Sequence, residues 1–164
     1  MQPVEELRYL VLAAQREGNR LLTEALRPLD LTPSQAEVLC VLQDHQPLSL
    51  FALGKLLICE SGSPSRLIDG LVKGGLVKRV PSAINGRMVT LTLTEKGQEM
   101  ATRVRAVEAV FYEFMSKALG QSPIEDSIAL LWRFVEGRPA GEALARRIRG
   151  MYEAEKPLVS PENE

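Results

Sequence analysis

Residues 74–97 decide the fold, and they read GGLVKRVPSAINGRMVTLTLTEKG. Two segments rich in β-branched residues, 76–80 and 88–93, flank a loop that contains Asn85-Gly86. In the second segment valine and leucine alternate with threonine, which is the period of a half-buried strand. The loop is too long for a tight hairpin, and Asn-Gly supplies its turn chemistry. The stretch therefore predicts a β-hairpin with a protruding basic tip.

Short helices are predicted just before this hairpin. Thr32-Pro33-Ser34-Gln35 combines an N-cap, a proline at the first helical position and a capping-box glutamine, so a helix should run to about Gln43. Ser49 begins a short helix, and Ser63 caps a further one that stops at Gly74-Gly75. Two short helices joined by a turn are compatible with a helix-turn-helix, and the hairpin makes it a winged one.

Longer amphipathic helices flank this module. The 3.6-residue period predicts helices over 4–29, 94–119 and 139–155. A further helix begins at a capping box formed by Ser122 and Glu125, with Pro123 at its first position. The fold class is thus mainly α with a small β-hairpin.

The flanking helices have apolar faces, but the segments next to them in the sequence do not provide a core against which these faces can pack. Helices of this kind often pack against the same helices of a second copy, which makes a two-fold dimer. The predicted organisation is an N-terminal dimerisation helix, a winged helix-turn-helix DNA-binding domain, C-terminal dimerisation helices and a disordered tail, which occupy residues 1–29, 30–97, 98–155 and 156–164.

The net charge of −1 conceals an uneven distribution. Residues 1–48 contain four basic and seven acidic side chains, whereas residues 49–100 contain seven basic and four acidic ones. From 61 to 90 there are five basic residues and one acid, Asp69. Such a basic island in an acidic frame indicates an anionic partner.

Several segments resemble the MarR family of bacterial transcription regulators: LTPSQAEVL at 31–39, SRLIDGL at 65–71, GLVKR at 75–79, NGR at 85–87 and LTLTEKG at 91–97. The resemblance covers roughly residues 5–136. It implies a recognition helix and a wing that bind duplex DNA. The chain departs from the family pattern at Asn85, where an aspartate is expected, at Gly62 and Pro64, and in the helix after Pro139, which extends past the usual end.

The candidate DNA contacts are Ser61, Ser63, Ser65, Arg66, Lys73, Lys78, Arg79, Asn85 and Arg87. The serines cluster at the start of the recognition helix, where hydroxyls and the helix N-terminus can meet phosphates. Arg66 has the fork geometry for a guanine edge, and the lysines and Arg79 suit phosphates. The resemblance implies that Arg87, at the wing tip, enters the minor groove.

Each of these contacts has a plainer alternative. Ser63 can be a helix cap only, and Arg87 a solvated loop residue. Arg66 and Lys73 can each pair with Asp69 along the helix. No aromatic residue occurs between Ala52 and Val110, so base stacking on a single strand is disfavoured and duplex DNA is the better partner.

Other functional classes have little support in the sequence. Two cysteines and one histidine do not make a common zinc site, and no phosphate loop or nucleophile motif occurs, so neither an enzyme nor a cofactor is expected. The longest uncharged run, 45–54, is too short to span a membrane. We expect a cytoplasmic protein with Cys40 in its core and His45 in a solvated turn.

The sequence thus predicts a sequence-specific regulator that binds double-stranded DNA. We expect a repressor acting as a homodimer on a pseudo-palindromic operator, with a small-molecule effector that changes the spacing of the two recognition helices. One alternative is a winged-helix protein-interaction module without DNA binding. Another is a thiol-based redox sensor acting through Cys59, in the turn before the recognition helix.

Overall fold

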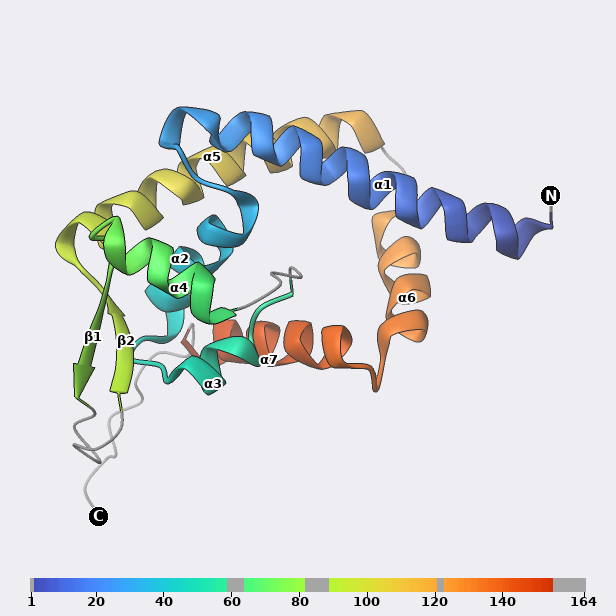
Figure 1. Cartoon of the computed structure of the whole chain (residues 1–164). Coiled ribbons are helices and arrows are strands. Elements are labelled where there is room, and N and C mark those ends of the chain that lie inside the picture. The colour runs from blue at the N-terminus through green and yellow to red at the C-terminus, as the bar shows by residue number, and fades with distance from the viewer. Residues whose placement is uncertain (1, 59–63, 82–88, 121–122, 155–164) are drawn as a thin grey trace, which may run out of the picture.

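The structure is a computed structural model, and it describes residues 2–58, 64–81, 89–120 and 123–154. Helices dominate it, with one small antiparallel sheet at the edge of the molecule (Figure 1). The elements in chain order are α1 (Pro3–Leu26), the 3₁₀ turn η1 (Arg27–Leu29), α2 (Pro33–His45), α3 (Leu50–Gly54), α4 (Pro64–Lys73), β1 (Val77–Pro81), β2 (Val89–Leu93), α5 (Glu95–Leu119), α6 (Ile124–Val135) and α7 (Pro139–Ala154).

The core is centred on α2 in the winged helix-turn-helix, and the end of α1 and the start of α5 contribute to it. Helix α2 buries Ala36 and then five consecutive residues, Val38 to Leu42, because neighbouring elements surround it. The surrounding elements contribute the remaining buried apolar side chains of this cluster, which are Leu26, Leu31, Leu53, Ile68, Leu71, Leu76, Val77, Leu91, Leu93, Ala101 and Val104.

The wing is a hairpin in which β1 and β2 pair antiparallel, from Val77 opposite Leu93 to Pro81 opposite Val89. A third segment joins it. The backbone N–H of Leu91 donates to the Leu48 carbonyl at 2.7 Å, and the Leu48 N–H donates to the Leu91 carbonyl at 3.2 Å. This bridge connects the wing to the segment between α2 and α3, and sequence reasoning missed it.

The predicted helix signals between Thr32 and Thr94 are confirmed where the structure describes them. Thr32 Oγ1 accepts from the Gln35 N–H at 3.3 Å, and Gln35 Oε1 accepts from the Thr32 N–H at 2.9 Å, which completes the capping box. Ser49 caps α3, and Gly75 takes the left-handed conformation with φ of 70° after α4.

Two local predictions are wrong. The capping box of Ser122 and Glu125 requires Pro123 to be the first helical residue, but Pro123 has a ψ of 84° and is itself the N-cap, without a side-chain cap. Ser122 lies outside the described residues. His45 is the last residue of α2 rather than part of a solvated turn, and α7 packs against it: a Cβ on Gly150 would lie 2.5 Å from its Cε1.

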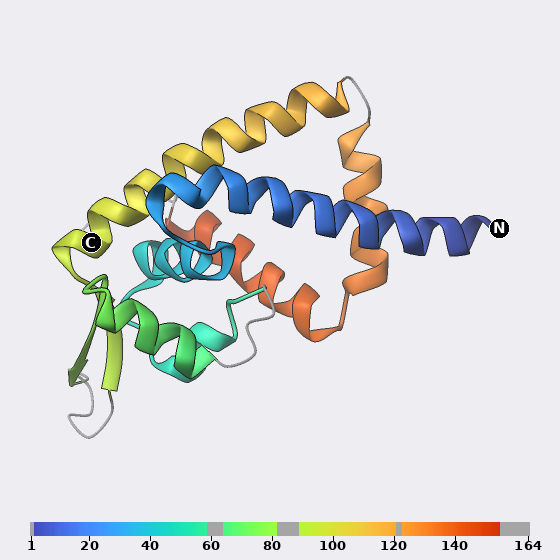
Figure 2. The same ribbon diagram turned by 45° about the horizontal axis from the view of Figure 1, so that its top comes forward.

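The long helices extend away from this core. Helix α1 runs beside α5, α6 turns away from the end of α5, and α7 returns towards α3 (Figures 1 and 2). The described part of the chain contains no helix long and apolar enough to cross a membrane. Large apolar side chains nevertheless remain exposed on three of these helices, among them Val4, Leu7, Leu10, Val110, Phe114, Met115, Ile128, Leu130, Leu131 and Phe134.

Candidate DNA interface

The first turn of α4 faces outwards. Ile68 and Leu71 bury the inner side of the helix, Arg66 lies on the opposite side, and Ser65 is exposed in the first turn. No described residue forms a hydrogen bond or ion pair with the Arg66 side chain. The guanidinium is therefore free of described protein partners.

Asp69 has a different partner from the two that the sequence suggested. Arg79 Nη2 donates to Asp69 Oδ1 at 2.6 Å, between β1 and the middle of α4, with both side chains more than two-fifths exposed. In this arrangement Asp69 pairs with neither Arg66 nor Lys73. The bridge ties the wing to the recognition helix and reduces the positive charge that Arg79 itself presents.

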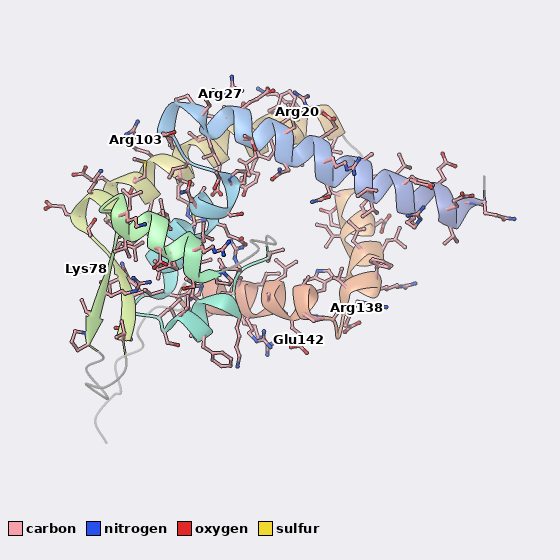
Figure 3. All side chains as sticks on the ribbon, in the orientation of Figure 1. Arg20, Arg27, Lys78, Arg103, Arg138 and Glu142 are labelled. Carbon is pink, nitrogen blue, oxygen red and sulfur yellow. The ribbon has the colours of Figure 1, made fainter. Side chains whose placement is uncertain are left out.

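Lysines surround the wing and the end of α4. Lys73 ends α4, and Lys78 lies on β1 at the outer edge of the molecule (Figure 3). Lys96, which we did not predict, donates from Nζ to the Gly74 carbonyl at 3.0 Å. The one sequence signal for Lys96 is its place in the basic segment 49–100. These three exposed cations give this end of the molecule a positive surface.

Four predicted contacts, Ser61, Ser63, Asn85 and Arg87, lie outside the described residues, as does Cys59. The other five predicted contacts are described: Ser65 and Arg66 lie in the first turn of α4, Lys73 at its end, and Lys78 and Arg79 on β1, which packs against α4.

A polar cluster lies on the other side of α2, against α5. Arg105 forms ion pairs with Asp44 and, at 3.7 Å, with Glu108, while Cys40 Sγ donates to Glu108 Oε2 at 3.8 Å. Burial raises the pKa of Glu108, an effect that the Arg105 charge partly offsets. Burial, together with the Glu108 carboxylate, raises the pKa of the Cys40 thiol to about 12.

A cavity of about 500 Å³ opens between the end of α3 and the start of α7. Leu57, Ile58 and Ala143 provide apolar walls, and Lys55 and Arg146 provide cationic groups. The volume is within the range of small-molecule pockets. Sequence reasoning did not identify it, because its two sides, residues 54–58 and 137–146, lie far apart in the sequence.

Residues 31–97 match the model of a winged helix DNA-binding domain. Over 88 residues the chain is 35% identical to the multiple antibiotic resistance protein MarR of Escherichia coli, a match that covers 54% of this chain and 61% of the relative. Its counterpart in Salmonella typhimurium is 28% identical over 133 residues, or 71% of this chain and 90% of the relative.

Solved structures extend the similarity to the flanking helices. A mutant of E. coli MarR complexed with operator DNA superposes with a TM-score of 0.72 and 28% identity, over 80% of this chain and 95% of that one. The transcriptional repressor CouR, bound to a DNA duplex, superposes with a TM-score of 0.73 at 23% identity, over 83% of this chain and 97% of that one, which shows a shared fold. Residues 31–97 therefore form a winged helix DNA-binding domain, and the chain is similar to the MarR proteins in sequence and in fold.

Proposed function

We propose that this protein is a sequence-specific transcription regulator that binds double-stranded DNA, and that it acts as a homodimeric, ligand-responsive repressor. The observation that carries the proposal is the outward-facing first turn of α4 next to a basic wing. The same fold holds operator DNA in the E. coli relative. Because bacterial operator DNA lies in the cytoplasm, the proposal includes a cytoplasmic location.

The side chains of the interface divide by chemistry. Arg66 reads a base edge, because its guanidinium has no partner among the described residues and can donate two parallel hydrogen bonds to guanine. The serine hydroxyls at the start of the recognition helix bind phosphates; they belong to Ser61, Ser63 and Ser65. Lys73, Lys78 and Arg79 bind phosphates, which fixes the position of the protein without reading sequence. Arg87 enters the neighbouring minor groove, and Asn85 is a further DNA contact from the same segment.

Two recognition helices in a two-fold dimer suit a pseudo-palindromic operator with half-sites about one helical turn apart. An effector that favours another spacing of the two helices releases the operator. The cavity between α3 and α7 is a candidate effector site, because its wall includes the segment that leads to α4. Ligand binding there is measurable as protection of residues 54–58 from hydrogen exchange.

Selection from a random-sequence duplex library identifies the operator, and a gel shift at two salt concentrations then measures binding. We expect affinity to fall steeply with salt. Arg66→Ala should cost about 1–3 kcal/mol at the selected site and relax its specificity, whereas Lys78→Ala should weaken binding to all duplexes alike. Absence of a complex at low salt contradicts the proposed function. Unchanged discrimination by Arg66→Ala contradicts the role of that residue.

A further inference from the structure

We propose that α7 holds the helix-turn-helix in its DNA-reading position, with Arg147 and Glu37 as the positioning residues. This inference rests on the proposed function, since it concerns how the recognition helix is presented to DNA. Helix α7 returns from α6 to the winged domain of the same chain (Figures 1 and 2).

The central contact is an ion pair between residues 110 positions apart. Arg147 Nη1 on α7 donates to Glu37 Oε1 on α2 at 2.7 Å, and the two side chains are only 25% and 12% exposed. The same oxygen accepts from the backbone N–H of Ile58 at 2.8 Å. Glu37 therefore joins α7 to the chain segment that leads from α3 to the recognition helix α4. Charge-assisted hydrogen bonds at low exposure are the strong ones.

A second contact reaches the same segment. Arg146 Nη1 donates to the carbonyl of Lys55, the C-cap residue of α3, at 3.3 Å. Glu142 fixes the Arg146 side chain through an ion pair of 2.6 Å along α7. Arg146 thus contacts the start of residues 55–58 directly, and Arg147 is linked to the end of this segment through Glu37.

Small residues let α7 approach closely. Ala143 is buried, and Gly150 lies against His45, where a Cβ would meet Cε1 at 2.5 Å. Together with Arg147 they form one face of α7, at spacings of four and three residues. The inner face of α7 is therefore shaped for the winged domain.

The corner between α6 and α7 is equally tight. A Cβ on Gly141 would lie 2.1 Å from the Val135 carbonyl oxygen, and Arg138 Nε donates to the Phe134 carbonyl at 2.9 Å. Figure 3 shows Arg138 at this corner and Glu142 on the following turn of α7. The packed and hydrogen-bonded corner restricts the angle between α6 and α7. We therefore expect a displacement of α6 to shift α7 against the segment before α4.

Hydrogen exchange of the full-length protein without DNA tests the link independently of the proposed function. Arg147→Ala should speed exchange of the amides of 55–58 and α4 by about tenfold, the effect of losing one charge-assisted hydrogen bond, while the core of α5 keeps its rate. Arg149→Ala is the matched control, because Arg149 is exposed and its hydrogen bond among the described residues is to the Ala145 carbonyl of the same helix. It should change nothing outside α7.

Glu37→Gln probes the other side of the ion pair. The variant keeps an acceptor for the Ile58 N–H but loses the charge that holds Arg147. We expect Glu37→Gln to speed amide exchange in α7 and α4. Adding Arg147→Ala to this variant should then change the exchange rates little. Arg147→Lys keeps the charge and should restore most of the protection.

Discrimination between operators of different half-site spacing is a measurement that a loss of stability alone does not change. On selected operators whose half-sites are moved one base pair closer or further apart, the wild-type protein should discriminate strongly, and Arg147→Ala should bind them more nearly alike. The inference is overturned if Arg147→Ala leaves the exchange rates of 55–58 and α4 unchanged. It is also overturned if Arg147→Ala and Arg147→Lys both raise the exchange rates uniformly along the chain. If the protein binds no DNA, the proposed function fails while the exchange result still decides whether α7 holds this segment.

Discussion

Cys40 lies within the buried face of α2, and its surroundings determine its chemistry. Desolvation of the thiolate and the nearby Glu108 carboxylate raise the pKa of the thiol to about 12. Because the thiolate is the reactive form, and only about one part in ten thousand is ionised at pH 8, Cys40 is unsuited to sensing oxidants. The alternative of a redox-sensing regulator therefore depends on Cys59, which is outside the described residues.

We expect iodoacetamide at pH 8 to leave Cys40 unmodified in the native protein and to alkylate it in concentrated guanidinium chloride. Peptide mass spectrometry over a time course measures the two rates. Equal rates in the two conditions contradict the burial of this thiol.

Glu108 provides a pH-dependent prediction. Its pKa in the folded state is raised above the ordinary 4.5. The ionised carboxylate therefore lowers the free energy of unfolding at pH values above the raised pKa. This destabilisation disappears below pH 4.5, where the carboxyl group is protonated in both the folded and the unfolded state. Glu108→Gln should therefore raise the urea midpoint at pH 7 and leave it unchanged near pH 4. Glu113→Gln is the control, since Glu113 is 65% exposed and its pair with Lys117 contributes little. Destabilisation of Glu108→Gln at pH 7 would show that its contacts with Arg105 and Cys40 outweigh its burial.

At the scale of elements, the start of α5 connects three parts of the winged domain. Thr94 Oγ1 accepts from the Gly97 N–H at 2.9 Å as the N-cap, and it donates to the Gly75 carbonyl at 2.7 Å after α4. A Cβ on Gly97 would lie 1.9 Å from the Leu76 carbonyl oxygen, so only glycine allows α5 to start this close to β1. One cap therefore sets the positions of recognition helix, wing and α5.

Thr94→Ala should lower the free energy of unfolding by about 1–2 kcal/mol, because the cap is lost and the Gly75 carbonyl loses its donor. Thr94→Ser retains the hydroxyl and should stay within about 0.5 kcal/mol of the wild type. Urea unfolding monitored by circular dichroism measures both. A loss in Thr94→Ser as large as in Thr94→Ala would assign the effect to the methyl group instead.

At the scale of the whole molecule, the apolar surface indicates what a single chain lacks. Helix α6 buries none of its residues, and Leu131 is 44% and Phe134 66% exposed. The first half of α1 and the second half of α5 are exposed in the same way. Many exposed large apolar side chains on helices indicate an association site, and a second copy would supply matching helices. Dimerisation of these helices remains our prediction.

Leu131→Asp should convert the dimer to a monomer, because a dimer would bury the new charge without a partner. Ala129→Asp is the matched control, since Ala129 lies four residues from both Glu125 and Arg133 on the polar side of α6. It should stay dimeric. Analytical ultracentrifugation measures the mass, and circular dichroism checks the fold. A dimer that survives Leu131→Asp with unchanged affinity places the interface elsewhere.

The sequence by itself determined the features that depend on near neighbours. The Thr32–Gln35 capping box, the Gly75 helix stop and the alternation in β2 each act within a few residues, so they were predicted correctly. The outward turn of α4 follows from the same periodicity. These signals sufficed for the winged helix and for the elements that carry its candidate DNA contacts.

Tertiary structure alone decided which distant groups meet. Asp69 pairs with Arg79 rather than Lys73, Leu48 joins the wing, and Arg147 finds Glu37 across 110 positions. Helical spacing predicts contacts three or four residues apart, whereas these pairs depend on how whole elements pack. The charge of a side chain and its place in the hydrophobic period show that it needs a partner. The packing of the complete chain decides which residue that partner is.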